Sequence, residues 1–358
     1  MSIVVDAHQD IAYNYLNFGR DYARSVYLTR SLEASAEKHP NGTATLGFPE
    51  ALLGRVALAF TTIFVAPQSK QPQPWDRLTY TTPREAHTLA HLQADYYERF
   101  TDENPQVWLV RTLQELDAVL ETWSSERQIS EHVQGWVLLM ENAEPVLEPP
   151  QFEEWYARGV RIVGPAWSFN RYTGGTGFPG GLTKLGYELL DILASFNIIL
   201  DLSHLAEEAY FQAVERYPGV VIASHSNPRR FRNSDRHLSD DMIRALADRD
   251  GVMGIVLYNR FLSDTWSLGD RKDAVGQFTP VDAIDYVCQL TGSAAHVGIG
   301  TDLDGGFGAE SIPAGFDTIA DIITIGDGLR ARGYAEADID AILSGNMLRK
   351  LRQALPEK

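Results

Sequence analysis

The feature that most constrains the fold is a regular alternation of short apolar, β-branched segments with longer segments of helical periodicity. The apolar segments lie at residues 3–6, 56–65, 135–140, 160–166, 198–202, 220–223, 252–257 and 297–300. Helical patterns lie between most of them, at residues 82–100, 182–196, 206–216, 239–249 and 280–290. Strands that alternate with helices form parallel sheets joined by crossovers. Eight such strands predict an α/β fold, a (β/α)8 barrel, as one catalytic domain over residues 1–358 that ends in helices.

An open, doubly wound sheet is the alternative, because it shows the same alternation of strands and helices. A dinucleotide-binding sheet of this kind carries Gly-x-Gly-x-x-Gly after its first strand, and this sequence does not. The glycine-rich stretch GGTGFPGG at residues 174–181 lacks the Lys-Ser/Thr ending of a phosphate-binding loop. We interpret it either as a mobile active-site loop or as a plain connection.

Composition excludes several classes of protein. The net charge is −17, which argues against nucleic acid or an anionic membrane as a partner. Cys288 is the single cysteine, so an intrachain disulfide and a cysteine-based metal site are excluded. No apolar run reaches membrane-spanning length, and the first residues lack the pattern of a signal peptide. We therefore expect a cytoplasmic protein that acts on small molecules.

Polar side chains that can bind a metal follow the apolar segments. The first segment ends in His8 and Asp10, which share one face of a strand because they are two residues apart. A nitrogen and an oxygen ligand side by side suit zinc, although an isolated pair could equally be a His–Asp hydrogen bond. Later segments end in further potential ligands: Glu141, His204, His225, Asp302 and Asp304. In a barrel the carboxyl ends of all strands meet at one face, where active sites lie.

The number of potential ligands indicates two metal ions. Three histidines and three carboxylates exceed the four ligands of one tetrahedral zinc, and they suit two ions that share a bridging carboxylate. These six residues are His8, Asp10, Glu141, His204, His225 and Asp302. Two adjacent metals activate a shared water and polarise a carbonyl oxygen, and a nearby carboxylate can transfer the proton. The pattern therefore predicts a hydrolase with two Zn²⁺ per chain, although the same ligands accept other divalent ions.

The remaining histidines are interpreted as structural or surface residues. His87 and His91 are four residues apart on a helix, but no HExxH motif surrounds them. His296 precedes the last strand and so lies at the opposite end of the predicted barrel. The others, in polar stretches, are expected to be solvated: His39, His132 and His237.

Several motifs together resemble the membrane (renal) dipeptidase family, peptidase family M19 of the amidohydrolase superfamily. They are DAHQD, MENAEP, DLSH, ASHSN, DRHLSDD, GIGTDLDGG and ILSGNMLR, in this order along the chain. The resemblance implies a metal-dependent amidohydrolase barrel with a binuclear zinc centre, and a hydroxide bridging the two metals would attack the peptide carbonyl. It also implies a homodimer, because family members are often dimers.

The resemblance assigns a role to each potential ligand. His8 and Asp10 would hold the first zinc, Glu141 would bridge both metals, and the second zinc would be held by His204 and His225. Asp302 would lie beside the bridging hydroxide and pass its proton to the leaving amine.

Asp304 is interpreted as a structural carboxylate. Two further positions match residues that contact the substrate in the family. Arg236 would bind the terminal carboxylate of a dipeptide, since its planar guanidinium pairs with carboxylates through two hydrogen bonds. Tyr258 would line the pocket or pack in the core.

The sequence departs from the family after the fourth predicted strand. Renal-type dipeptidases carry a Thr-His there, whereas this chain has Trp167, which cannot act as an acid or a base. Asn170 and Arg171 are expected to replace part of the lost polar contact. Three functions stay open. They are a dipeptidase, including one for L-Xaa–D-Xaa dipeptides, a metal-dependent hydrolase of an N-acyl amino acid or lactone, and a non-catalytic metal-binding barrel.

Overall fold

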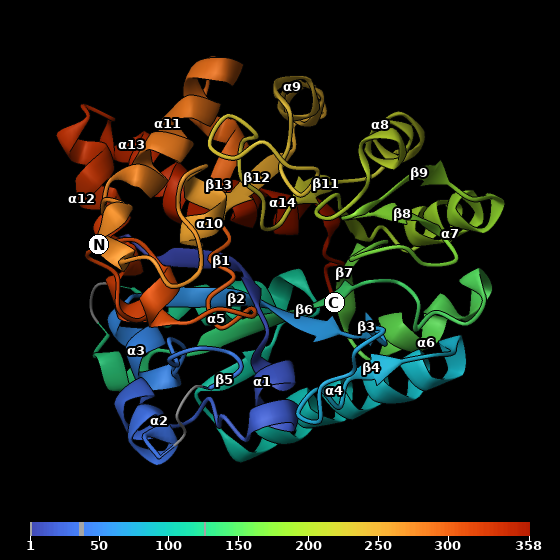
Figure 1. Cartoon of the computed structure of the whole chain (residues 1–358), viewed down its shortest axis with the longest axis horizontal. Helices are drawn as coiled ribbons and strands as arrows, with labels where there is room; N and C mark the ends of the chain where they lie inside the picture. Colours follow the sequence, from blue (N-terminus) through green and yellow to red (C-terminus); the bar gives the residue numbers. More distant parts are fainter. Residues whose placement is uncertain (1, 36–38, 125–126) are drawn as a thin grey trace.

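A closed barrel of parallel strands forms the centre of the molecule (Figure 1). The computed structural model describes residues 2–35, 39–124 and 127–358. Neighbouring strands pair in the order β2-β1-β13-β12-β11-β10-β7-β6, and pairing of β2 with β6 closes the ring. The strands are β1 (Val4–Gln9), β2 (Val56–Phe64), β6 (Gln134–Glu141), β7 (Val160–Gly164), β10 (Ile199–Asp201), β11 (Val221–Ala223), β12 (Val252–Ile255) and β13 (Val297–Ile299). The predicted (β/α)8 barrel is confirmed, and closure rules out the open sheet.

The helices expected from periodicity are present with nearly the predicted bounds. They are α4 (Pro83–Glu103), α7 (Lys184–Ser195), α8 (Glu207–Arg216), α9 (Asp240–Asp248) and α11 (Thr279–Thr291). Local sequence explains where two of them begin. The Thr82 hydroxyl accepts a hydrogen bond from the backbone of Glu85, whose side chain reciprocates in a capping box. Ser239 caps α9 in the same way by accepting from the backbone N–H of Met242.

Shorter elements were not predicted, because segments of two to nine residues carry little periodicity. Strand β5 (Val107–Leu109) pairs with the start of β6 outside the ring, and β3 (Ala66–Pro67) pairs with β4 (Thr79–Tyr80). The additional helices are α1 (Ile11–Phe18), α2 (Val26–Glu33), α3 (Phe48–Leu53), α5 (Leu113–Glu121), α6 (Phe152–Ala157), α10 (Asn259–Leu262), α12 (Thr324–Ala331), α13 (Glu336–Asp340) and α14 (Asn346–Ala354).

The glycine-rich stretch forms a β-hairpin rather than a loop without regular structure. Strands β8 (Thr173–Gly175) and β9 (Phe178–Leu182) pair antiparallel. A Cβ atom on Gly174 would lie 2.6 Å from the carbonyl oxygen of Gly180. The glycine therefore serves close approach of the two strands, a role that is not apparent from composition alone.

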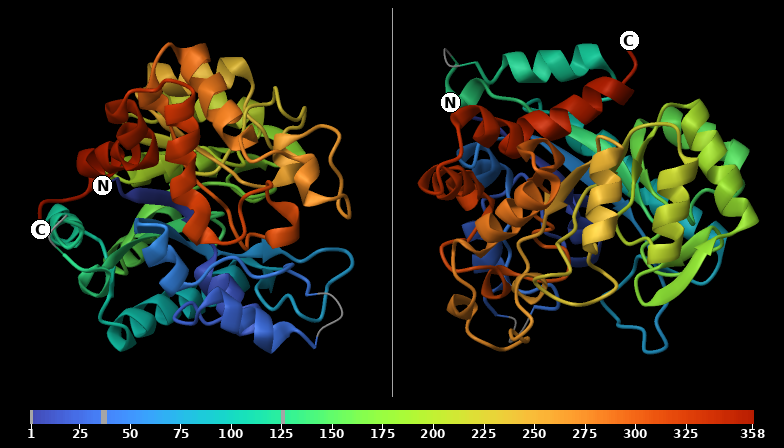
Figure 2. Two further views of the ribbon diagram at one scale, coloured as in Figure 1. Left: turned by 90° about the vertical axis from the view of Figure 1, so that its left-hand side faces the viewer. Right: turned by 90° about the horizontal axis from the view of Figure 1, so that it is seen from above.

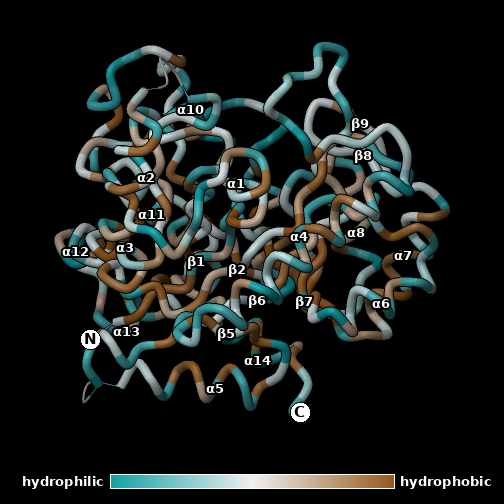
Figure 3. Tube along the Cα trace, turned by 90° about the horizontal axis from the view of Figure 1, so that it is seen from below, coloured by the Kyte–Doolittle hydropathy of each residue, from teal (hydrophilic) through white to brown (hydrophobic). Residues whose placement is uncertain are grey.

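One end of the barrel is covered by the end of the chain. A buried apolar cluster joins Val5, Leu139 and Ile199 of the barrel strands to Met347 and Leu351 of α14. Helices α5 and α14 run side by side in the right-hand view of Figure 2. Both chain ends lie near these two helices and opposite α10 and β9 (Figure 3). In the described part of the chain, no helix has the length and apolarity needed to cross a bilayer.

Candidate metal centre

Glu141, the last residue of β6, lies between two groups of histidines. Its Oε2 atom is 3.4 Å from Nε2 of His8. Its Oε1 atom is 3.2 Å from Nε2 of His204 and 3.4 Å from Nε2 of His225. Each oxygen of one carboxylate thus faces a different set of imidazoles, which is the arrangement of a bridging ligand.

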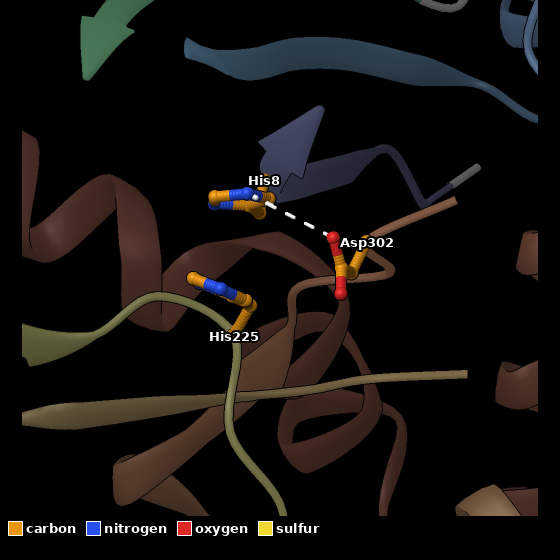
Figure 4. A group of neighbouring side chains, drawn as sticks. All are labelled: His8, His225 and Asp302. Carbon is orange, nitrogen blue, oxygen red and sulfur yellow. Dashed lines mark ion pairs between the residues drawn. The ribbon is translucent and has the colours of Figure 1, made fainter. Parts of the chain in front are cut away.

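The two other predicted carboxylates complete the cluster. Nε2 of His8 is 3.7 Å from Oδ1 of Asp10 and 3.8 Å from Oδ1 of Asp302. Figure 4 shows His8 on β1 beside His225 and Asp302, which lie in the segments that follow β11 and β13, with the His8–Asp302 ion pair dashed. The rings of His8 and His225 stack with centroids 3.6 Å apart. The structure therefore brings all six predicted ligands together.

Unusual backbone conformations direct several of these side chains into the site. His204 and Asp302 have φ angles of 67° and 57°, in the left-handed region that residues other than glycine seldom occupy. Such conformations concentrate at functional sites. Gly305 allows the sharp turn after Asp302, because a Cβ atom there would lie 2.0 Å from Oδ1 of Asp302.

Hydrogen bonds behind the site orient two of the histidines. Ser224 donates its hydroxyl proton to Oδ2 of Asp201 at 2.5 Å, and its Oγ lies 2.8 Å from Nδ1 of His225. Because Ser224 has no second proton to give, Nδ1–H of His225 must donate to it, which leaves the lone pair on Nε2 for a metal. Oγ1 of Thr176, in the turn of the β8–β9 hairpin, lies 3.0 Å from Nδ1 of His204.

The electrostatics of the buried cluster favour a cation. Burial, together with the charges of Asp10 and Glu141, raises the pKa of Asp302 well above its usual value. Burial and the charge of His8 also hold the pKa of His225 well below its usual value, so its imidazole is neutral. Burial likewise lowers the pKa of His204 to about 4. A divalent ion would relieve the repulsion among the carboxylates and bind the neutral imidazoles of His204 and His225. The donor set of three nitrogens and three carboxylates fits two such ions.

The six residues open into a cavity of about 610 Å³. Of the predicted substrate-binding residues, Arg236, Trp167 and Tyr258 line it. The ring of Trp167 meets Phe64 edge to face at 5.3 Å, and Tyr258 stacks on Phe307 at 4.3 Å. Sequence reasoning missed other lining residues: Tyr13, Phe64, Trp75, Asp76, Thr176, Arg232 and Arg260. Only Thr176, the polar residue inside the glycine-rich stretch, carried a signal in the sequence.

Arg236 lies beside the metal ligands without a counter-ion. It donates from Nη2 to the carbonyl oxygen of His225 at 2.6 Å and from Nη1 to Oγ of Ser226 at 3.3 Å. Among the described residues no carboxylate oxygen lies within 4.0 Å of its guanidinium. The side chain is 8% exposed, so this charge is held in the cavity wall and is available to an anionic ligand.

Asn170 and Arg171 do not contact the cavity, which corrects the prediction for both. The Asn170 amide donates to Oδ1 of Asn142 at 2.8 Å and accepts from the backbone of Tyr172 at 2.8 Å. Arg171 pairs with Glu144 at 2.8 Å. Asn170 therefore joins the β7–β8 loop to the loop after β6, and Arg171 binds the loop after β6.

Asp304 is turned away from the metal ligands. It accepts from the backbone N–H and hydroxyl of Thr45 at 2.8 and 2.7 Å, and it lies 3.4 Å from Arg20. These contacts are those expected of a structural carboxylate.

Two of the histidines that were expected to be solvated are buried. His132 is 5% exposed and stacks on Trp123 with centroids 4.3 Å apart. His237 is 1% exposed and lines the cavity. Both histidines lie in loops, but they are buried against aromatic rings rather than solvated: His132 faces Trp123 and His237 faces Phe261. His39 contacts Arg20 at 3.0 Å, and His296 contacts the carbonyl oxygen of Gly251 at 3.0 Å.

His87 and His91 form a second cluster with Glu154, at α4 and α6. Their Nε2 atoms are 3.1 Å apart. Arg158 lies 2.8 Å from Nδ1 of His91 and can only donate, so that nitrogen accepts and the proton of His91 is on Nε2. Nδ1 of His87 lies 3.0 Å from the carbonyl oxygen of Pro145 and must donate to it. The two Nε2 atoms are thus joined by a hydrogen bond.

Comparison with known proteins decides the family. The model of the membrane dipeptidase family, peptidase family M19, matches residues 1–357. The chain belongs to this family. As an M19 peptidase it is a metal-dependent dipeptidase, and the predicted enzyme class is confirmed.

Several proteins are similar to this M19 chain. An uncharacterised protein in the pqqA 5′ region of Klebsiella pneumoniae is 32% identical over 57% of the chain and 76% of its own length. An uncharacterised dipeptidase of Schizosaccharomyces pombe is 23% identical over 97% of the chain and 79% of its own length. A metallopeptidase from Rhodobacter sphaeroides, solved with a phosphinate mimic of the dipeptide L-Ala-D-Ala, has a TM-score of 0.77 at 22% identity and covers 99% and 100% of the two chains.

Proposed function

We propose that this chain hydrolyses dipeptides with two zinc ions at the mouth of its barrel. His8, Asp10 and Glu141 would hold one ion, and Glu141, His204 and His225 the other. The proposal rests on the position of the Glu141 carboxylate between two sets of imidazoles. One of its oxygens faces His8 and the other faces His204 and His225, at distances of 3.2–3.4 Å. Two bound metal ions supply an activated water at neutral pH and polarise the scissile carbonyl.

Arg236 would fix the carboxyl end of the substrate. Its buried guanidinium has no protein counter-ion among the described residues and lines the same cavity as the metal ligands. A free terminal carboxylate would accept two parallel hydrogen bonds from it. This would place the last peptide bond of the substrate at the metals, because only that bond lies one residue from the terminal carboxylate.

The opposite side of the mouth carries an acid that suits the free amine. Strands β2 and β11 are four positions apart in the ring of eight strands. The loops after them therefore lie on opposite sides of the barrel mouth. Asp76 lies in the loop after β2 and lines the cavity, whereas Arg236 lies in the loop after β11. Oδ1 of Asp76 has no hydrogen-bond partner. A zwitterionic dipeptide would therefore lie across the metal centre with its ammonium toward Asp76.

Asp302 would move the proton during the reaction. Its Oδ1 lies 3.8 Å from Nε2 of His8, so its carboxylate would be close to a water activated by a metal that His8 holds. It would take the proton of that water and give it to the leaving amine, as a general base and then a general acid. Trp167 would form a wall of the pocket, since it offers only an N–H donor.

The experiment that tests the proposal is hydrolysis of L-Xaa–L-Xaa and L-Xaa–D-Xaa dipeptides by zinc-reconstituted protein, with metal content measured on the same sample. We expect turnover with about two zinc ions per chain. N-acetylated substrates distinguish the alternative hydrolase: a dipeptidase with an ammonium subsite rejects them. Two bound metals without turnover of any dipeptide would overturn the proposal.

A further inference from the structure

Three arginines line the cavity, and terminal-carboxylate binding uses only one of them. Arg232 and Arg236 lie in the loop after β11, and Arg260 lies in α10 after the neighbouring strand β12. No carboxylate oxygen of the described residues lies within 4.0 Å of any of the three guanidinium groups. The three charges are thus concentrated on one side of the mouth, on loops that follow adjacent strands.

The absence of carboxylate partners for these arginines does not come from a shortage of aspartate and glutamate in the chain. The chain has 48 aspartates and glutamates against 31 lysines and arginines. Arg229, in the same loop as Arg232, pairs with Glu207 at 2.8 Å. An acidic protein that leaves three cavity arginines unpaired presents a local positive potential to an anionic ligand.

Neither Arg232 nor Arg260 has its charge neutralised by a carboxylate among the described residues. Arg232 is half-buried and donates from Nη1 to the carbonyl oxygen of Ser263 at 3.3 Å, which leaves its other donors free. Arg260 is exposed on α10 and, like Tyr258, lines the cavity. Its guanidinium therefore remains available to an anionic ligand in the cavity.

We propose that the preferred dipeptides carry aspartate or glutamate as their second residue, and that Arg232 and Arg260 bind its side-chain carboxylate. This inference rests on the proposed dipeptidase function, because Arg236 must take the terminal carboxylate for the second residue to point along this side of the mouth. Charge-assisted hydrogen bonds from two guanidinium groups would then recognise the second carboxylate of the substrate.

The test compares isosteric substrates on the zinc-reconstituted full-length enzyme. We expect kcat/KM for L-Ala–L-Glu to exceed that for L-Ala–L-Gln by about tenfold or more, and the same for the aspartate and asparagine pair. The series with a D-residue in second position shows which stereochemistry presents the carboxylate to the arginines. Higher ionic strength should lower the ratio, because both arginines are accessible to solvent.

Variants assign the preference to the two arginines. Arg232→Gln and Arg260→Gln should each lower the Glu/Gln ratio at least about threefold. Arg230→Gln is the matched control, since Arg230 is exposed in the same loop, does not line the cavity, and its loss changes the net charge equally. Its ratio should stay unchanged.

The outcomes separate this inference from the proposed function. Equal cleavage of the Glu and Gln dipeptides, or a preference that persists in both arginine variants, would overturn the acidic-residue proposal and leave the dipeptidase intact. Cleavage of none of these dipeptides by protein with two metals bound would overturn both.

Discussion

Two clusters in this molecule contain the same residue types and differ in what they can bind. At the barrel mouth, His204 and His225 flank Glu141, with Nε2 atoms 3.0 Å apart. At α4 and α6, His87 and His91 lie near Glu154, with Nε2 atoms 3.1 Å apart. Residue type and nitrogen spacing therefore do not distinguish the two clusters.

The position of the imidazole protons does distinguish them. Ser224 accepts the Nδ1 proton of His225 and leaves its Nε2 free for a metal. Arg158 donates to Nδ1 of His91 and forces the proton onto Nε2. A guanidinium behind His91 and a serine–aspartate pair behind His225 thus make the mouth cluster the better candidate for a metal site.

The largest expected effect is on metal content. Glu141→Gln should lose most of the bound zinc and lower kcat/KM by about a thousandfold or more, because a neutral amide cannot bridge two cations. His87→Gln, the control from the other cluster, should keep both metals. Elemental analysis after dialysis and kinetics on the same samples measure this. Loss of zinc from His87→Gln but not from Glu141→Gln would show that the cluster at α4 and α6, and not the barrel mouth, binds the metals.

Asp302→Asn should separate chemistry from metal binding at the mouth. We expect zinc content to stay close to that of the wild type and kcat to fall by about 10²–10⁴-fold, since the amide cannot accept a proton from water. Single-turnover kinetics with measured metal content provide the check. Wild-type kcat in this variant would refute the proton-transfer role.

Substitution of the arginine beside each cluster should produce a smaller difference, seen in KM. Arg236→Ala should raise KM for a free dipeptide by about ten- to a hundredfold, and it should have little effect on the C-terminal amide of the same dipeptide. Arg158→Ala should leave KM unchanged for both substrates. An equal loss on the free and amidated substrates would show that Arg236 acts through protein structure instead.

The smallest effect concerns pH. Burial, with the charges of His87 and Arg158, lowers the pKa of His91 in the folded protein. The unfolded chain then binds a proton below about pH 6.5 that the folded chain does not, so stability falls as pH decreases through this range. His91→Gln should make Tm between pH 5 and 7 slightly less pH-dependent. Thermal unfolding across this range measures the slope, and an unchanged slope would show that His91 is protonated in the fold.

The sequence by itself determined the barrel and the convergence of the potential ligands. The carboxyl ends of parallel strands must meet at one face, so residues at these ends, such as His8 and Glu141, converge whatever path the loops take. Local signals such as the Thr82 cap likewise located helix starts without reference to the rest of the chain.

Only the tertiary structure decided how the loops fill the mouth. Asn170 was expected at the substrate, but it closes its own loop, whereas Asp76, Arg232 and Arg260 reach the cavity without any local pattern. His237 was expected in solvent and is buried for the same reason. Long connections are directed by contacts between segments distant in sequence, and those contacts exist only once the strands have closed the barrel.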